Sequence, residues 1–108
     1  MASSQLSGSL DLLLLSVLSA GEGHGYAVIT RLREQSGGAF DLPEGTVYPA
    51  LHRLEQDGLL SSRWDASSGR RRRAYAVTAA GARAMASKRE EWTAFSLGIQ
   101  SVLAGAVS

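Results

Sequence analysis

The spacing of apolar residues along the chain predicts four helices and one pair of strands. Over residues 5–20 the leucines and valines recur at i, i+3, i+4 and i+7, which indicates a helix with an apolar face. Leu12 and Leu15 widen that face, so this first helix carries more apolar surface than one core needs. We expect the surplus to pack against a second subunit.

Two shorter helices are expected next, each bounded by glycine. Residues 21–25 contain three glycines and predict a tight turn between helices, because a phosphate-binding glycine loop would follow a strand. A second helix is expected over 26–35 and a third over 44–57, with Gly58 placed to end the third in a left-handed conformation. Pro49 removes a backbone donor inside the third helix, so we expect an irregular N-terminal end there.

A basic hairpin follows the third helix. Residues 59–64 and 70–77 read as strands, joined by a polar turn over 65–69. Four consecutive arginines, Arg70–Arg73, begin the second strand. Strand alternation places Arg71 and Arg73 on one face of the hairpin and the other two arginines on the opposite face.

The last helix begins near Thr78 and carries a short apolar seam. Met85, Trp92 and Ile99 are spaced by seven residues, and Phe95 falls between them. Large apolar side chains on such an arm need a partner to cover them. We therefore expect an interface, either between subunits or with an effector, that includes Leu10, Leu14, Met85, Trp92, Phe95 and Ile99.

These elements predict a mainly α fold with a small β-hairpin. The order of a helix with a polar outer face followed by a basic hairpin is that of a winged helix-turn-helix. We assign residues 5–78 to this DNA-binding unit and residues 79–106 to a C-terminal dimerisation helix. A length of 108 residues fits one such small domain, which gains stability from oligomerisation.

Composition narrows the function classes. The net charge is only +1, so the clustering of the arginines is more informative than the total. There is no cysteine, which excludes disulfides and thiol chemistry. The apolar run at 12–15 is too short to span a bilayer, and the N-terminus lacks the basic lead-in of a signal peptide. We expect a cytoplasmic protein with no membrane contact.

Candidate chemistry favours binding over catalysis. His24 and His52 are the only histidines, and no HxxxH or cysteine–histidine spacing supports a metal site. No residue pattern places two carboxylates or a nucleophile and base together. We expect no enzyme activity, no cofactor and no metal.

The candidate DNA-binding surface combines the hairpin with the outer face of the third helix. Arginine matches phosphate oxygens through its planar guanidinium, and a hairpin of this kind contacts phosphates or the minor groove. On the helix, Thr46, Tyr48, His52 and Arg53 are candidates for base or phosphate contacts. Tyr48 as a half-buried packing residue, and His52 as an ordinary surface histidine, remain alternatives.

Three segments together resemble the PadR family of winged-helix transcriptional regulators: YAVITRL at 26–32, EGTVYPALHRLEQDGLLSSRW at 44–64 and GRRRRAYAVTAAG at 69–81. The likeness extends from Leu10 to about Trp92, and the single C-terminal helix is similar to the small subgroup of the family. It implies that Pro49 is a normal feature of the recognition helix. The DNA-facing set that it implies is Thr46, Tyr48, Pro49, His52, Arg53, Arg70, Arg71, Arg72 and Arg73.

The resemblance also implies how the protein works. It indicates a homodimer on double-stranded DNA with a palindromic operator, most often as a repressor. The Glu91–Trp92 pair resembles the pore tryptophan position of the multidrug-binding members. Trp92 is then either a packing residue at the dimer seam or one wall of a site for a flat hydrophobic small-molecule effector. The competing function class is a protein-interaction module whose basic hairpin binds an acidic partner.

Overall fold

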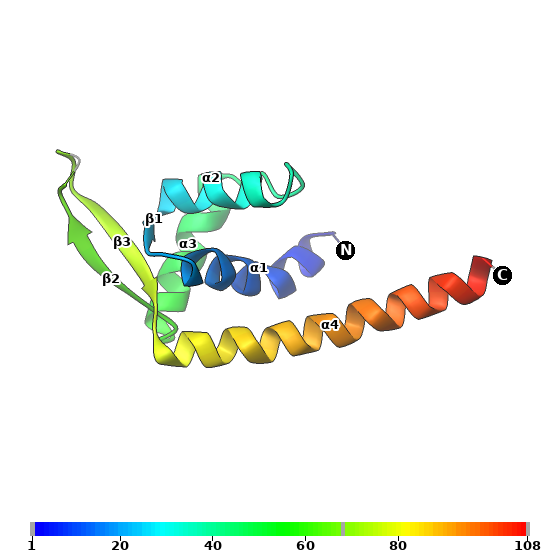
Figure 1. Ribbon diagram of the computed structural model, residues 1–108. Helices are drawn as coiled ribbons and strands as arrows, with labels where there is room; N and C mark the ends of the chain where they lie inside the picture. The colour runs from blue at the N-terminus through cyan, green and yellow to red at the C-terminus, as the bar shows by residue number, and fades with distance from the viewer. Residues whose placement is uncertain (1, 68, 108) are drawn as a thin grey trace.

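The computed structural model describes residues 2–67 and 69–107, with side chains for 9–67 and 69–106. Three short helices and a small sheet form the body, and one long helix crosses it and extends beyond (Figure 1). The elements in chain order are α1 (Ala2–Ser19), β1 (Gly23–His24), α2 (Gly25–Gln35), α3 (Glu44–Gln56), β2 (Leu60–Asp65), β3 (Arg72–Val77) and α4 (Ala79–Val107).

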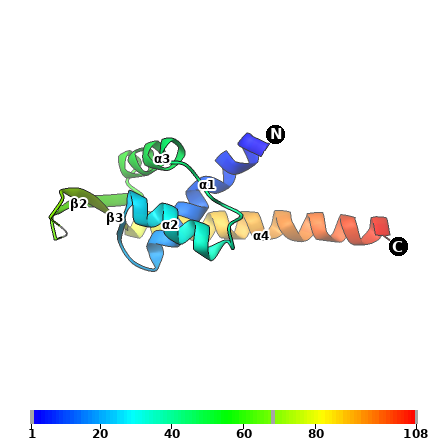
Figure 2. The same cartoon turned by 90° about the horizontal axis from the view of Figure 1, so that it is seen from above.

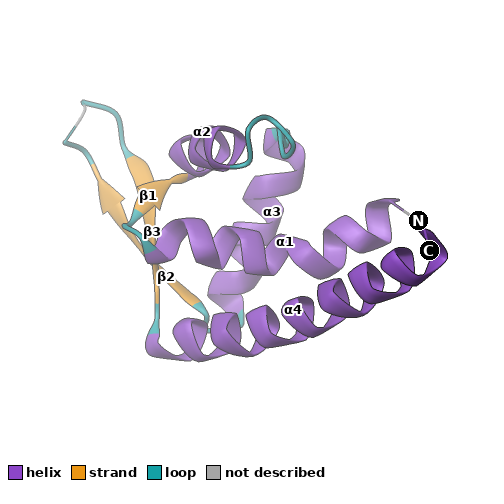
Figure 3. Cartoon of the chain, turned by 45° about the vertical axis from the view of Figure 1, so that its right-hand side comes forward, coloured by secondary structure: helices purple, strands orange, loops and turns teal. Residues whose placement is uncertain are grey.

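The core lies between α1, α2 and α3. Leu14, Leu51 and Leu54 are completely inaccessible to solvent, and Tyr75 of β3 closes the side that faces the sheet. Figure 3 shows α1 passing between α4 and the other two helices. The expected apolar faces of α1, α2 and α3 are thus confirmed, since each is turned toward this centre.

The sheet has three antiparallel strands in the order β1-β3-β2. The expected interhelical turn at 21–25 is in part a strand, because Gly23 and His24 pair with Tyr75 and Ala74. A two-residue strand is too short for alternation to reveal it. The second hairpin strand begins at Arg72, so Arg70 and Arg71 lie in the connection before it rather than in the ladder.

The links between elements follow the expected cap chemistry. Gly58 ends α3 with a φ of 78°, a left-handed conformation that glycine adopts without strain. Thr78 caps α4, because its Oγ1 accepts a hydrogen bond from the backbone N–H of Gly81 at 3.0 Å. The same hydroxyl donates to the carbonyl of Gly58 at 2.7 Å, which fixes the start of α4 against the end of α3.

The helix α4 runs without a break through all three of its glycines. Gly81 has a structural reason, because a Cβ there would lie 2.0 Å from the carbonyl oxygen of Leu59. The early turns of α4 pack along α1, and the later turns extend away from the body (Figure 2). The molecule is correspondingly elongated, with extents of 59 × 27 × 23 Å.

Most of the extra apolar surface of α1 is buried within the chain itself. Leu15, which widens the apolar face, is completely buried, and Leu12 is half-buried. Leu10 and Leu14, assigned to the interface set, lie in the core of this same domain. Most of the large exposed apolar side chains therefore lie on α4, with Tyr26 and Trp64 exposed elsewhere. Across the described residues, no helix is both long enough and apolar enough to span a membrane.

Candidate nucleic-acid interface

The helix α3 presents a polar face opposite its buried stripe. Val47, Ala50, Leu51 and Leu54 point into the core. The expected irregular N-terminal end is not found within the described helix, which is continuous from Glu44 to Gln56 with Pro49 inside it. The solvent side carries the half-buried Thr46 and the exposed Pro49, His52 and Arg53, whereas Tyr48 is partly buried and packs against the core.

Arg53 is held against α1. Its guanidinium donates two hydrogen bonds to the Asp11 carboxylate, at 2.7 and 3.1 Å. This bidentate pair raises the pKa of Arg53, chiefly through the hydrogen bonds to Asp11. The pair fastens the last turn of α3 to α1, and it engages the guanidinium that sequence reasoning had assigned to DNA.

The hairpin formed by β2, β3 and their connection, called the wing below, has arginines in two settings. Arg70 and Arg71 are exposed before the ladder begins. The guanidinium carbons of Arg71 and Arg73 lie 4.6 and 5.0 Å from the centre of the Trp64 ring. Both arginines therefore share one face, as strand alternation predicted, and both make cation–π contacts with the same ring.

Arg73 connects the wing to α3. Its Nε donates to Ser62 Oγ at 2.9 Å, and its Nη2 lies 3.3 Å from Glu55 Oε2. Ser62 Oγ donates in turn to Glu55 Oε2 at 2.5 Å, and this bond is the main cause of the lowered pKa of Glu55. We call these three residues the Glu55 latch. It holds the wing at a set position relative to α3.

A second set of polar contacts holds the wing to the segment before α2. His24 Nε2 lies 3.0 Å from Asp65 Oδ2, and Arg63 pairs with Glu22. The pKa of Asp65 falls to about 2, first because it accepts a hydrogen bond from the backbone N–H of Ser67. Sequence reasoning missed these pairs, because their members lie 41 residues apart and only the sheet brings them together.

A cavity of about 280 Å³ lies in the corner between α3 and the wing. It brings together five of the expected DNA-binding residues with five that sequence reasoning did not select. The expected residues are Tyr48, His52, Arg71, Arg72 and Arg73, and the others are His24, Gly25, Tyr26, Trp64 and Tyr75. A cationic and aromatic surface of this kind is suited to binding an anion.

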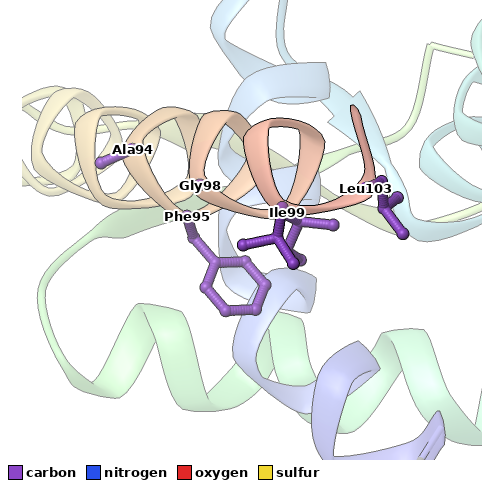
Figure 4. A pocket seen from close by; sticks show the side chains of 6 residues that line it. Ala94, Phe95, Gly98, Ile99 and Leu103 are labelled. Atoms are coloured by element: carbon purple, nitrogen blue, oxygen red, sulfur yellow. The ribbon is translucent and has the colours of Figure 1, made fainter. Parts of the chain in front are cut away.

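The outer turns of α4 form a separate apolar surface. Phe95, Ile99 and Leu103 project from the same side of the helix (Figure 4), and each is about half exposed or more. With Ala94, Gly98 and Val102 they line a groove of about 480 Å³. Trp92, also half exposed, lies beside a smaller hollow of about 180 Å³, which is lined by Leu12, Lys88, Glu91, Trp92 and Phe95.

The sequence matches a family model described as the transcriptional regulator PadR-like family, over residues 14–87. Among curated proteins, Transcriptional regulator Rv3488 of Mycobacterium tuberculosis is 45% identical over 76 residues. That match covers 68% of this chain and 71% of the relative. The region that the family model matches includes most of the core, α3 and the whole wing.

Solved structures of bacterial regulators have the same fold. A transcriptional regulator from Clostridium thermocellum superposes with a TM-score of 0.83 at 28% identity, covering 91% of this chain and 96% of the other. A PadR family transcription regulator from Clostridium difficile gives 0.78 at 33% identity, with 88% and 98% covered. The chain therefore belongs to the PadR-like family of transcriptional regulators, which are not enzymes.

Proposed function

We propose that this regulator binds double-stranded DNA through α3 and the wing, and that it does so as a homodimer. The observation that carries the proposal is the position of the arginines. The wing arginines and the polar face of α3 border one cavity, so a single surface offers both a helix for the major groove and cations for the backbone.

The two parts of this surface have different tasks. On α3, Thr46, Tyr48 and His52 are the candidates for contacts with base edges or phosphates, because a recognition helix of this kind enters the major groove. Arg70 and Arg71 of the wing contribute affinity through phosphates, with little sequence preference. Arg73 acts mainly by holding the wing in place, since it already has partners in Glu55 and Ser62.

The homodimer is proposed from the apolar surface of α4. Trp92, Phe95, Val102 and Leu103 are each more than half exposed, which is costly for an isolated arm. A second copy with the same groove covers this surface. The symmetric dimer places two α3 helices about one DNA turn, ~34 Å, apart on a palindromic operator.

We also propose that the protein is a repressor and that a small-molecule effector relieves the repression. A flat hydrophobic molecule has a place beside Trp92, in the hollow between α1 and α4. Because α4 carries the dimer contacts, an occupant there changes the spacing of the two α3 helices. The effector releases DNA only if it binds the released arrangement more tightly than the DNA-bound one.

Selection of binding sites from random duplex DNA tests the proposal. We expect enrichment of one palindromic motif with half-sites about one turn apart. Weak retention of all duplexes without enrichment would contradict the regulator assignment. It would favour the alternative, in which the basic wing binds an acidic protein partner.

A further inference from the structure

The cavity between α3 and the wing is best explained by an anion that lies between the two elements. We propose that it is a phosphate-binding site that receives one backbone phosphodiester of the DNA in each half-site. The inference rests on the proposed function and deepens it, because it names the group bound in this corner and adds Tyr26 and Tyr48 as its hydroxyl donors.

Groove geometry places a DNA strand at this corner. The major and minor grooves of a duplex are separated by a sugar–phosphate strand. With α3 in the major groove and the wing at the neighbouring minor groove, that strand passes between the two elements. The cavity lies at this place, since Tyr48 and His52 of α3 line one side and the wing arginines line the other.

The charge of the cavity suits a phosphate. Three arginines and no described carboxylate line it. The carboxylates of Glu55 and Asp65 are engaged with other residues, because Glu55 accepts hydrogen bonds from Ser62 and Arg73, and Asp65 pairs with His24. Arg71 contacts the Trp64 ring and forms no ion pair within the described part of the chain. Its charge is therefore available to a ligand.

Two tyrosines supply neutral donors beside the arginines. Tyr26, at the start of α2, is 61% exposed, and neither its hydroxyl nor that of Tyr48 forms a hydrogen bond with any described residue. Gly25 leaves room for the Tyr48 ring, because a Cβ at residue 25 would lie 2.4 Å from its Cε1 atom. The absence of a side chain at Gly25 thus lets Tyr48 lie at the beginning of α2, next to Tyr26.

The test combines removal of the two tyrosine hydroxyls from the protein with removal of the charge of one phosphate at a time from the DNA. Tyr26→Phe with Tyr48→Phe removes both donors and keeps both rings, so the fold is preserved. Ser61→Ala is the matched control, because it removes an exposed hydroxyl of β2 outside the cavity. Each protein is titrated with the selected operator and with a series of duplexes that carry one neutral methylphosphonate at successive positions. Thermal unfolding confirms that the variants fold.

On the unmodified operator we expect the double variant to bind roughly tenfold more weakly than wild type and the Ser61→Ala control. At one position in each half-site, the methylphosphonate should weaken wild type and leave the double variant nearly unaffected, because both changes remove the same interaction. Specific operator binding with no such position would overturn the phosphate site and leave the proposed function standing. Failure of wild type to bind any duplex would overturn both.

Discussion

The wing and the outer half of α4, residues 92–106, extend from the same small core and expose opposite chemistry. The wing carries guanidinium groups, and its position is fixed by the Glu55 latch and by the His24–Asp65 pair. The outer half of α4 carries exposed apolar side chains, and Gln100 and Ser101 form hydrogen bonds along the helix itself. A charged surface is stable in water without a partner, whereas removing the apolar surface of α4 from water is favourable in free energy.

This contrast bears on the proposed homodimer. The wing is already ordered by contacts within the chain, so DNA meets a prepared surface and little ordering entropy is lost on binding. The apolar half of α4 remains exposed after the chain has folded, and we propose that a second α4 covers it. On this proposal the wing contacts DNA and α4 makes the assembly contacts.

Removing the apolar surface of α4 should have the greatest effect. Phe95→Asn with Ile99→Asn replaces two exposed side chains that line the groove, so the isolated chain should remain folded. Sedimentation should change from dimer to monomer, and operator affinity should fall by about 100-fold or more, because two linked half-sites no longer bind together. A variant that remains dimeric would show that the interface lies elsewhere.

Removing the exposed arginines of the wing should have the second largest effect on DNA affinity. With Arg70→Ala and Arg71→Ala, binding to every duplex should weaken. The slope of log affinity against log salt should fall by ~0.9 for each phosphate that is no longer neutralised. The slope is measured by fluorescence anisotropy at several salt concentrations. Arg83→Ala on α4 is the control, since it removes an exposed arginine that lies away from the wing. Equal slopes for both variants would contradict the wing assignment.

The Glu55 latch gives a prediction in which electrostatic repulsion and positioning of the wing change the operator affinity in opposite directions. Glu55→Gln removes a negative charge near DNA, so electrostatics alone predicts tighter binding. If the latch fixes the wing, operator binding should instead weaken, by about three- to tenfold, while binding to unrelated DNA changes little. Titration of both duplexes with Glu55→Gln and wild type distinguishes the two effects, and tighter operator binding would refute the latch.

A smaller effect concerns acid stability at the outer end of the wing ladder, where Asp65 lies opposite Arg72. The folded-state pKa of Asp65 is about 2, below its ordinary value of 3.8. A lowered pKa means that Asp65 contributes stability above about pH 4, and that this contribution is lost as the pH falls toward 2. The melting temperatures of wild type and Asp65→Asn should therefore differ at pH 6 and converge near pH 2. A difference independent of pH would contradict this role.

Much of the fold could be predicted from sequence, because the local patterns are strong. The helix stripes, the left-handed Gly58 and the faces of Arg71 and Arg73 all follow from periodicity or backbone chemistry. What escaped prediction depends on the packing of distant segments. Nothing local marks β1 as a strand, or shows that Leu15 is needed by the core of its own domain rather than by a partner.

The candidate site shows the same division. The basic run and the outer face of α3 select most of the surface without a structure. Sequence alone could not separate the held arginines from the exposed ones, because Asp11 lies 42 residues from Arg53 and Glu55 lies 18 from Arg73. Tyr26 and Trp64 were missed as part of this surface, since each is brought to it only by the packing of α2 and the sheet.

DNA binding by α3 and the wing is tested most directly by the affinity of the dimer for its selected operator and for a scrambled duplex, measured across a range of salt concentrations. We predict a steep negative slope of log affinity against log salt for both duplexes, and much tighter binding of the operator throughout. Weak binding that is equal for the two duplexes and insensitive to salt would contradict this role of α3 and the wing.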